Sequence, residues 1–245
     1  MVTEEISSRL IPLTRKEVHE KVVQILSMEE KGKLLDVPTG TGSLASRLQK
    51  MGFAVSCCDI QPSFFAAEGL TVQFGDMNKK LPYKAACFDY IVCLDGLEHT
   101  ENPFNAIREF GRILKGGGKI FLSIPNFLNI ERRLRFVLTG TFSKIPTLDT
   151  LRDVWKDELS MVHLNSLGYP LLKFVMEHYG FRILRVERDR EKPKMVWLRP
   201  LVWIIHLYAL FSSRRRRELY RLDETLMDEI IMGGNTLILV GEKVV

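Results

Sequence analysis

An acid and two glycines stand at or just beyond the end of a short apolar run at residues 33–37: Asp36, Gly40 and Gly42. A strand that leads through a glycine turn into a helix brings bare backbone and the positive end of a helix dipole close to a ligand. The glycine spacing also fits a dinucleotide fingerprint, so the motif alone leaves two cofactor classes open. Asp36 favours a ligand with a cationic group, because a carboxylate before the turn repels a pyrophosphate but attracts an ammonium.

Two further acids stand where the next strands are expected to end. Asp59 ends the run 53–59, where it can accept hydrogen bonds from both hydroxyls of a ribose. Asp76 ends the run 70–76, where a carboxylate can meet an adenine amino group while the sulfur of Met77 packs on the ring. Together the acids favour an adenosyl group with a cationic amino-acid tail.

The elements that must position these residues alternate between strand and helix. Strands are predicted at residues 33–37, 53–59, 70–76, 88–95, 119–125, 181–189 and 235–244. Helices are predicted at residues 14–29, from a Thr14–Glu17 capping pattern, 43–51, 103–114, which "KGGG" ends, and 169–179. This order predicts an α/β fold, a three-layer, doubly wound, mostly parallel sheet that binds ligands at the carboxyl ends of its strands.

The domain organisation follows from the same pattern. We expect residues 1–31 to form an N-terminal helical cap and residues 32–245 to form the main domain. The irregular stretch 127–168 predicts a helical insertion, with helices in "ERRLRFVL" and "TLRDVWKDEL". An apolar and then basic segment, 195–217, separates the last two strands.

The overall composition limits the kinds of protein that this chain can be. The 245 residues are 46% hydrophobic, which is enough for a sizeable core, and the net charge of +5 does not by itself indicate nucleic acid. The four cysteines lack disulfide or zinc spacing, so reduced thiols are expected. The first residues show no secretory signal. We therefore expect a cytoplasmic protein, with a peripheral position at the inner face of the membrane as the alternative.

Most of residues 33–181 resembles the class I S-adenosylmethionine-dependent methyltransferases, especially the type 11 and type 23 small-molecule branch that includes quinone-biosynthesis enzymes. The matching stretches are "LLDVPTGTGSLA", "VSCCDIQPSFF", "VQFGDMNKKLPY", "FDYIVCLDGLEHTENPFNAIREFGRILKGGGKIFLSIPN" and "HLNSLGYPLLKFVMEHYGF". The resemblance implies a Rossmann-like sheet of seven strands in which the last is antiparallel. It also implies S-adenosylmethionine as cofactor and S-adenosylhomocysteine as product.

The resemblance assigns roles to individual residues. Asp36, Gly40 and Gly42 would cradle the methionine moiety, Asp59 would hold the ribose, Ile60 would pack beside the adenine, Asp76 and Met77 would meet the adenine, and Asp95 and Gly96 would close the pocket. Pro38 stands where the family usually has glycine. Because proline fixes φ and lacks a donor, the cofactor turn must tolerate both.

His99 and His163 are the candidate catalytic residues. A histidine can remove the proton of an acceptor hydroxyl near neutral pH, although either residue could instead orient a loop. We expect at least one of them to face the acceptor. Asp95, Glu98 and the two histidines lack metal-ligand spacing, so no metal is expected.

The expected reaction is transfer of a sulfonium methyl group to a small-molecule or lipid-like acceptor, most readily at oxygen. One alternative is an RNA or protein methyltransferase that uses its arginines on phosphates, although no recognition module is present and nucleic acid is not the expected partner. A second alternative is an S-adenosylmethionine-binding interaction protein without turnover. An NAD-linked oxidoreductase would not explain the stretches after the glycine turn.

The segment from Trp197 to Arg217 is an apolar and then basic stretch that a methyltransferase fold does not require. Its apolar run of 12 residues, 200–211, is too short to cross a bilayer, which takes roughly 20 residues. One interpretation is a helix that covers the sheet or forms a homodimer contact. The other is an interfacial helix on an anionic membrane, with its aromatic residues at headgroup depth, its arginines on lipid phosphates, and "ERRLRF" on the same basic face.

Overall fold

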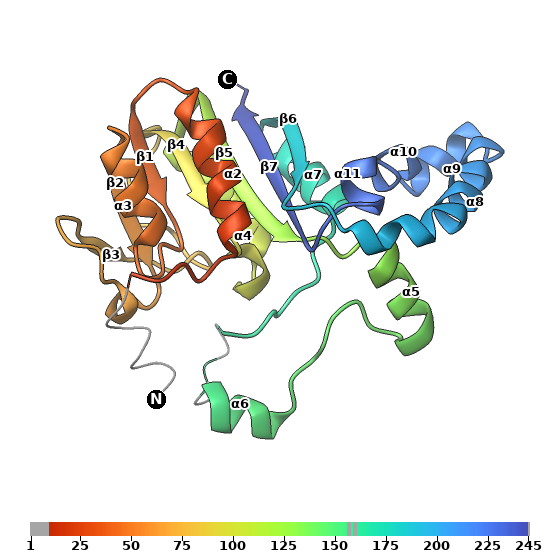
Figure 1. The fold of residues 1–245 in the computed structure, drawn as a ribbon. Coiled ribbons are helices and arrows are strands. Elements are labelled where there is room, and N and C mark those ends of the chain that lie inside the picture. The colour runs from red at the N-terminus through yellow and green to blue at the C-terminus, as the bar shows by residue number, and fades with distance from the viewer. Residues whose placement is uncertain (1–9, 156–157, 159–160, 245) are drawn as a thin grey trace.

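The computed structural model describes residues 10–155, 158 and 161–244. A seven-stranded sheet lies between two layers of helices, with strand order β3-β2-β1-β4-β5-β7-β6 (Figure 1). The strands are β1 (Lys33–Asp36), β2 (Ala54–Asp59), β3 (Val72–Phe74), β4 (Phe88–Cys93), β5 (Leu114–Pro125), β6 (Phe181–Arg188) and β7 (Thr236–Lys243). Only β7 runs antiparallel to its neighbours. The predicted fold class and the antiparallel last strand are confirmed.

Alternating strand residues pack in two separate hydrophobic cores, one on each face of the sheet, because successive side chains of a strand point to opposite faces. Leu34 and Phe121 pack with helices α2 (Lys16–Ser27) and α3 (Ser43–Lys50) on one face. Leu35 and Leu122 pack with α4 (Pro103–Ile113) and α7 (Tyr169–His178) on the other. The predicted cap helix α2 therefore shares the core of the sheet.

Two local predictions are wrong. Helix α2 begins at Lys16 with Arg15 at its N-cap and no side-chain capping bond, so the Thr14–Glu17 pattern does not cap it. Helix α4 is not ended by the glycines after it, because β5 already begins at Leu114 and includes them. The glycines lie where the register between β4 and β5 shifts, and a Cβ on Gly118 would lie 2.9 Å from the Asp89 carbonyl oxygen of β4.

The predicted insertion contains α5 (Ile130–Thr139) and α6 (Leu148–Trp155). Helix α6 lies below the carboxyl ends of the strands in Figure 1. Asn129 caps α5 by accepting a hydrogen bond from the Arg132 amide at 2.9 Å. Some predicted positions lie outside the described residues: 1–9 of the cap, 156–157 and 159–160 of the second insertion helix, and Val245.

The segment between β6 and β7 forms an arm that projects beyond the sheet (Figure 1). It contains η4 (Pro193–Leu198), α8 (Arg199–Leu210), α9 (Arg214–Leu219), α10 (Leu222–Thr225) and α11 (Asp228–Ile231). Val202 and Ala209 of α8 are buried in a third core, with Ile130 of α5, instead of against the sheet. Within the described ranges, none of the helices combines the length and apolarity that crossing a bilayer requires.

Candidate functional site

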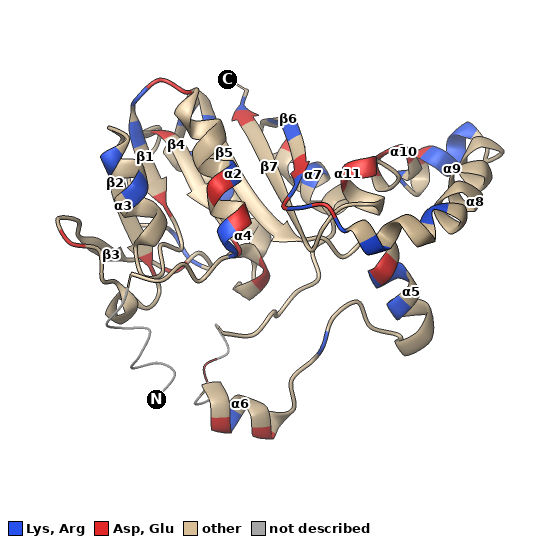
Figure 2. Ribbon diagram, viewed as in Figure 1, with Lys and Arg blue, Asp and Glu red and all other residues tan. Residues whose placement is uncertain are grey.

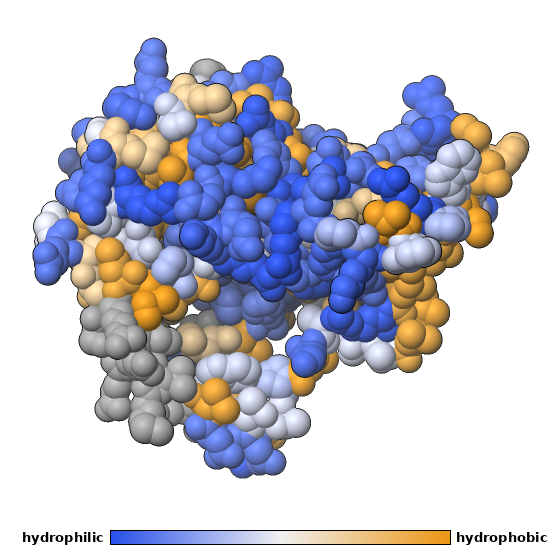
Figure 3. Space-filling model, viewed as in Figure 1, coloured by the Kyte–Doolittle hydropathy of each residue, from blue (hydrophilic) through white to orange (hydrophobic). Residues whose placement is uncertain are grey.

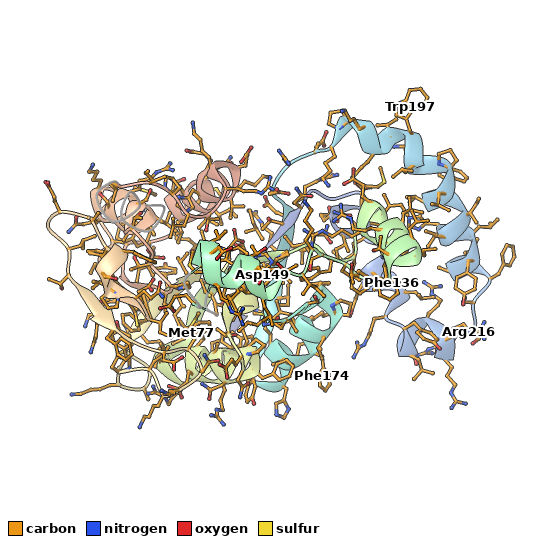
Figure 4. The ribbon with its side chains drawn as sticks, turned by 90° about the horizontal axis from the view of Figure 1, so that it is seen from below. Met77, Phe136, Asp149, Phe174, Trp197 and Arg216 are labelled. Carbon is orange, nitrogen blue, oxygen red and sulfur yellow. The ribbon has the colours of Figure 1, made fainter. Side chains whose placement is uncertain are left out.

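A cavity of about 840 Å³ opens at the carboxyl ends of the strands, between the start of α2 and the insertion. Small-molecule sites typically occupy about 300–1,000 Å³, so this volume leaves room for an acceptor beside a cofactor. Figure 4 views the molecule from this side, with Met77 below the sheet and α6 in front. Eleven of the twelve predicted site residues line the cavity: Asp36, Pro38, Gly40, Asp59, Ile60, Asp76, Met77, Asp95, Gly96, His99 and His163.

Gly42 is the predicted residue that is absent from the lining. It precedes α3 at φ +81°, a left-handed conformation that disfavours side chains. A Cβ here would also lie 2.5 Å from Cε2 of Phe65. Gly42 therefore shapes the turn, while Gly40 presents its backbone to the cavity.

The carboxylate of Asp59 is fixed by two backbone amides. Gly40 donates to its Oδ2 and Gln61 donates to its Oδ1, each at 2.8 Å. An ionised carboxylate offers about four acceptor positions, so these two bonds leave capacity for both hydroxyls of a ribose. The geometry fits the predicted role of Asp59.

Asp36 is buried beneath the turn and accepts a hydrogen bond from the Thr39 hydroxyl at 2.8 Å. The pKa of Asp36 is raised to about 7, mainly by burial and less by the nearby Asp59, against the lowering effect of the Thr39 hydrogen bond. A cationic group in the cavity would favour the ionised form. Asp36 therefore fits an amino-acid ammonium group.

Pro38 is accommodated by the backbone on either side of it. Val37 donates to the Val92 carbonyl at 2.9 Å and Thr39 donates to the Cys58 carbonyl at 3.0 Å, so the turn stays tied to both neighbouring strands. The proline ring packs on Gly96, where a Cβ would lie 2.4 Å from Cδ of Pro38. A side chain at position 96 would therefore clash with Pro38, so the proline requires glycine at that position.

Asp76 and Met77 form one wall of the cavity with Ile60. The Asp76 carboxylate accepts from the Asn78 amide at 2.9 Å and lies 3.4 Å from the Lys79 ammonium. The Met77 side chain is buried, and its carbonyl accepts a hydrogen bond from Asn105 of α4 at 2.9 Å. These contacts support an apolar slot with an acid at its edge, as an adenine requires.

Asp95 is held by a residue that the sequence analysis missed, Ser123 of β5. The Ser123 hydroxyl accepts from the Asp95 amide at 2.8 Å and donates to its Oδ1 at 2.5 Å. Asp95 lies at φ +46°, and burial raises the pKa of its carboxyl group. Ser123 lies within an apolar strand run, so no spacing signal singled it out.

His99 and His163 meet edge to face, with ring centroids 4.8 Å apart and planes at 86°. His99 follows β4 in the short helix η2 (Leu97–His99), and its Nδ1 lies 3.0 Å from the Val162 carbonyl oxygen. His99 therefore ties the loop together and also borders the cavity. Although much of His163 is exposed, partial burial lowers the pKa of its ring, and the nearby Arg132 lowers it further.

Glu98 joins the two histidines in a cluster that sequence spacing did not reveal. One ligand atom from each of the three lies within 4.8 Å of the others, and carboxylate and imidazole are ligands that divalent metals accept. Oε2 of Glu98 is buried without a hydrogen-bond partner among the described residues, and burial raises the pKa of Glu98 well above its usual range. The expected absence of a metal stays a prediction, and these are the side chains that a metal titration would test.

Arg132 of α5 is a second residue that the sequence analysis missed. It lines the cavity, lies over the Phe127 ring at 4.9 Å, and has one buried guanidinium nitrogen without a partner among the described residues. Its neighbour Arg133 donates to the carbonyls of Leu128 and Thr225. The expectation that "ERRLRF" forms an outward basic face is therefore wrong for these two arginines, because the α5 packing turns them inward.

Comparisons with known proteins identify the family of the chain. Residues 13–186 match the type 23 methyltransferase-domain family. The chain is 33% identical over 103 residues to a ubiquinone biosynthesis O-methyltransferase of Xanthomonas oryzae pv. oryzae, a match that covers 38% of this chain and 43% of that protein. The chain thus matches less than half the length of this relative.

Two solved structures share the fold. An S-adenosylmethionine-dependent methyltransferase from Archaeoglobus fulgidus is 16% identical, with a TM-score of 0.57 over 92% of this chain and 94% of that one. A phosphoethanolamine N-methyltransferase from Haemonchus contortus, solved with S-adenosylmethionine, is 14% identical, with a TM-score of 0.57 over 99% of this chain and 56% of that one. With the family match to residues 13–186, they show that the chain belongs to the class I S-adenosylmethionine-dependent methyltransferases, in the type 23 methyltransferase-domain family.

Proposed function

We propose that the protein transfers a methyl group from S-adenosylmethionine to a hydroxyl oxygen of a small, lipid-like acceptor. The observation that carries the proposal is the arrangement of one cavity. At one side, Asp36 and the amide-bound Asp59 fit a cationic adenosyl ligand, and at the other His99 and His163 fit a proton acceptor. The similarity to ubiquinone biosynthesis O-methyltransferases supports oxygen as the methylated atom.

The cofactor supplies an electrophilic methyl group on a sulfonium. The residues of the chain then have two tasks: to hold the acceptor oxygen about 3 to 3.5 Å from that methyl group in line with the carbon–sulfur bond, and to exclude water. A histidine that accepts the hydroxyl proton makes the oxygen a better nucleophile. The oxygen–carbon bond forms as the carbon–sulfur bond breaks, and S-adenosylhomocysteine leaves with the electron pair on sulfur.

His163 suits the role of base better than His99. The lowered pKa of His163 keeps its ring neutral near pH 7, ready to take a proton. His99, in contrast, has one ring nitrogen directed at the Val162 carbonyl oxygen. We therefore assign proton removal to His163 and orientation of the His163 ring to His99.

The test measures S-adenosylhomocysteine formation with a short-chain prenylated dihydroxybenzene as acceptor. The control acceptor is the same compound with both hydroxyls already methylated. Product formation with the first acceptor alone supports methyl transfer to oxygen. Equal rates with both acceptors, or binding of S-adenosylhomocysteine without turnover on either, would contradict it, and the second result would favour a non-catalytic binding protein.

A further inference from the structure

Helix α8 is apolar on both sides. Val202 and Ala209 are buried in the core of the arm, whereas Trp203, Ile204 and Leu210 are 77%, 63% and 69% exposed. A helix that is hydrophobic all round belongs in a fully apolar environment, which water does not provide for its outer side. The outer side of α8 therefore needs a partner.

The exposed apolar surface continues from α8 onto η4 and α5. We call it the apolar ridge; its members are Val137, Leu138, Trp197, Trp203, Ile204, Leu207, Leu210 and Phe211. Figure 3 shows apolar side chains along this edge of the molecule, over α8 and α5. In Figure 4, Trp197 points away from the body of the protein at one end of the arm, and Arg216 lies at the other. Exposed surface of this extent marks a site of association with a protein or a membrane.

Basic charge is concentrated beside the ridge. Residues 193–221 contain seven Lys and Arg and one Glu, whereas the rest of the chain contains 28 Lys and Arg and 29 Asp and Glu. Arg214, Arg215 and Arg216 are exposed on α9, next to the end of α8 (Figure 2). The positive charge is thus concentrated in residues 193–221 of the arm, where it favours an anionic partner.

We propose that the apolar ridge and the arginines of α9 dock the protein on an anionic lipid surface. The charge decides against a second copy of the chain, because a symmetric contact would bring two basic 193–221 segments together. Indole side chains such as Trp197 and Trp203 suit the depth of lipid headgroups. The 12 residues of α8 extend about 18 Å, short of the roughly 30 Å of a bilayer core, so the helix lies in the interface.

Docking would also bring the cavity close to the lipid. Helix α5 carries Arg132, which lines the cavity, and Val137 and Leu138, which belong to the ridge. The step from Arg132 to Val137 is about 7.5 Å along a helix axis. A lipid-like acceptor could therefore leave the bilayer beside α5 and enter the cavity. This last step depends on the proposed function, whereas the docking itself does not.

The experiment is flotation of the full-length protein with two kinds of vesicle, phosphatidylcholine alone and phosphatidylcholine mixed with phosphatidylglycerol. We expect at least about tenfold more protein to float with the anionic vesicles at low salt, and most of it to be released at high salt. We expect W203S/F211S and R214Q/R215Q/R216Q each to reduce flotation about tenfold. The matched control is F174S, because Phe174 is an exposed apolar side chain of α7 that does not belong to the apolar ridge.

Several outcomes would overturn the docking proposal. These are no flotation, equal flotation with both vesicles, or equal losses in F174S and W203S/F211S. Sedimentation as a dimer that W203S/F211S abolishes, without flotation, would instead identify the ridge as a contact between copies. Thermal unfolding and S-adenosylhomocysteine binding check that each variant is folded. Flotation without S-adenosylhomocysteine formation would contradict the proposed function alone.

Discussion

The backbone amide of Gly40 donates a 2.8 Å hydrogen bond to Oδ2 of Asp59. This bond joins the glycine turn after β1 to the acid at the end of β2, which are 19 residues apart in the sequence. The orientation of the carboxylate is therefore set before any ligand arrives. Preorganisation of this kind reduces the entropy lost on binding.

Asp59→Ala should weaken S-adenosylhomocysteine binding about 10- to 100-fold, because hydrogen bonds to a charged group contribute roughly 1.5–3 kcal/mol. Titration calorimetry measures the effect. Asp149→Ala is the matched control, since the Asp149 carboxylate of α6 is 86% exposed and far from the turn in sequence. An unchanged affinity in Asp59→Ala would show that the acid of the second strand does not hold the ligand.

The raised pKa of Asp36 predicts a pH dependence of binding. Asp36 titrates near pH 7 in the free protein, and a cationic ligand prefers its ionised form. Affinity for S-adenosylhomocysteine should therefore increase as the pH rises from 6 to 8, beyond the change caused by titration of the ligand itself. Asp36→Asn should bind S-adenosylhomocysteine weakly, and its affinity should not show this additional increase with pH. Parallel pH profiles in both proteins would contradict the assignment.

The same group predicts how stability depends on pH. The pKa of Asp36 is about 7 in the folded protein, above the ordinary value of 3.8, so the folded state holds the proton more tightly. Its contribution to the free energy of unfolding is full below about pH 4 and is lost as the pH rises through about 7. Urea denaturation at several pH values should show that Asp36→Asn removes this decline. If the free energy of unfolding of Asp36→Asn fell equally with pH, the decline would belong to another titrating group.

Gly96→Ala should destabilise the protein by about 1–3 kcal/mol, because the new methyl group would clash with the Pro38 ring. Pro38→Gly removes that ring, so the double variant should recover part of the loss. A thermodynamic cycle measured by denaturation gives the coupling between the two sites. Additive effects would mean that the two residues do not constrain each other.

His163→Ala should lower kcat about tenfold or more and leave S-adenosylhomocysteine affinity unchanged, because His163 lines the cavity and the proposed function assigns proton removal to it. His99→Ala should act through His163, so its pH–rate profile should shift as well as fall. Turnover within twofold of the parent protein in both variants would contradict a role for either histidine.

The sequence predicted the parts of the site that lie on strand ends. Asp36, Asp59 and Asp76 each follow an apolar run, and parallel strands bring their carboxyl ends to one edge of the sheet. The role of Gly42 beside the ligand stays a prediction; its close approach to Phe65 could not be predicted, because a local pattern does not show distant neighbours.

The parts that could not be predicted depend on packing between distant segments. Arg132 belongs to the stretch "ERRLRF", which predicts a basic face, and only the packing of α5 places it in the lining of the cavity. Glu98 and His163 are far apart in the sequence, and they meet because the Leu164 amide bonds to the Glu98 carbonyl at 2.8 Å. Strand β5 includes the glycines after α4 at the point where its register with β4 shifts, between the pairs Phe88–Leu114 and Tyr90–Lys119, and a local pattern does not show such a shift.

The central claim is that the turn of Gly40 and the acid of the second strand hold an adenosyl ligand. A crystal structure of the protein with S-adenosylhomocysteine tests it most directly. We expect density for the ligand over this turn, with both ribose hydroxyls within hydrogen-bond distance of Asp59 and the amino group facing Asp36. An empty turn, with the ligand bound elsewhere, would contradict it.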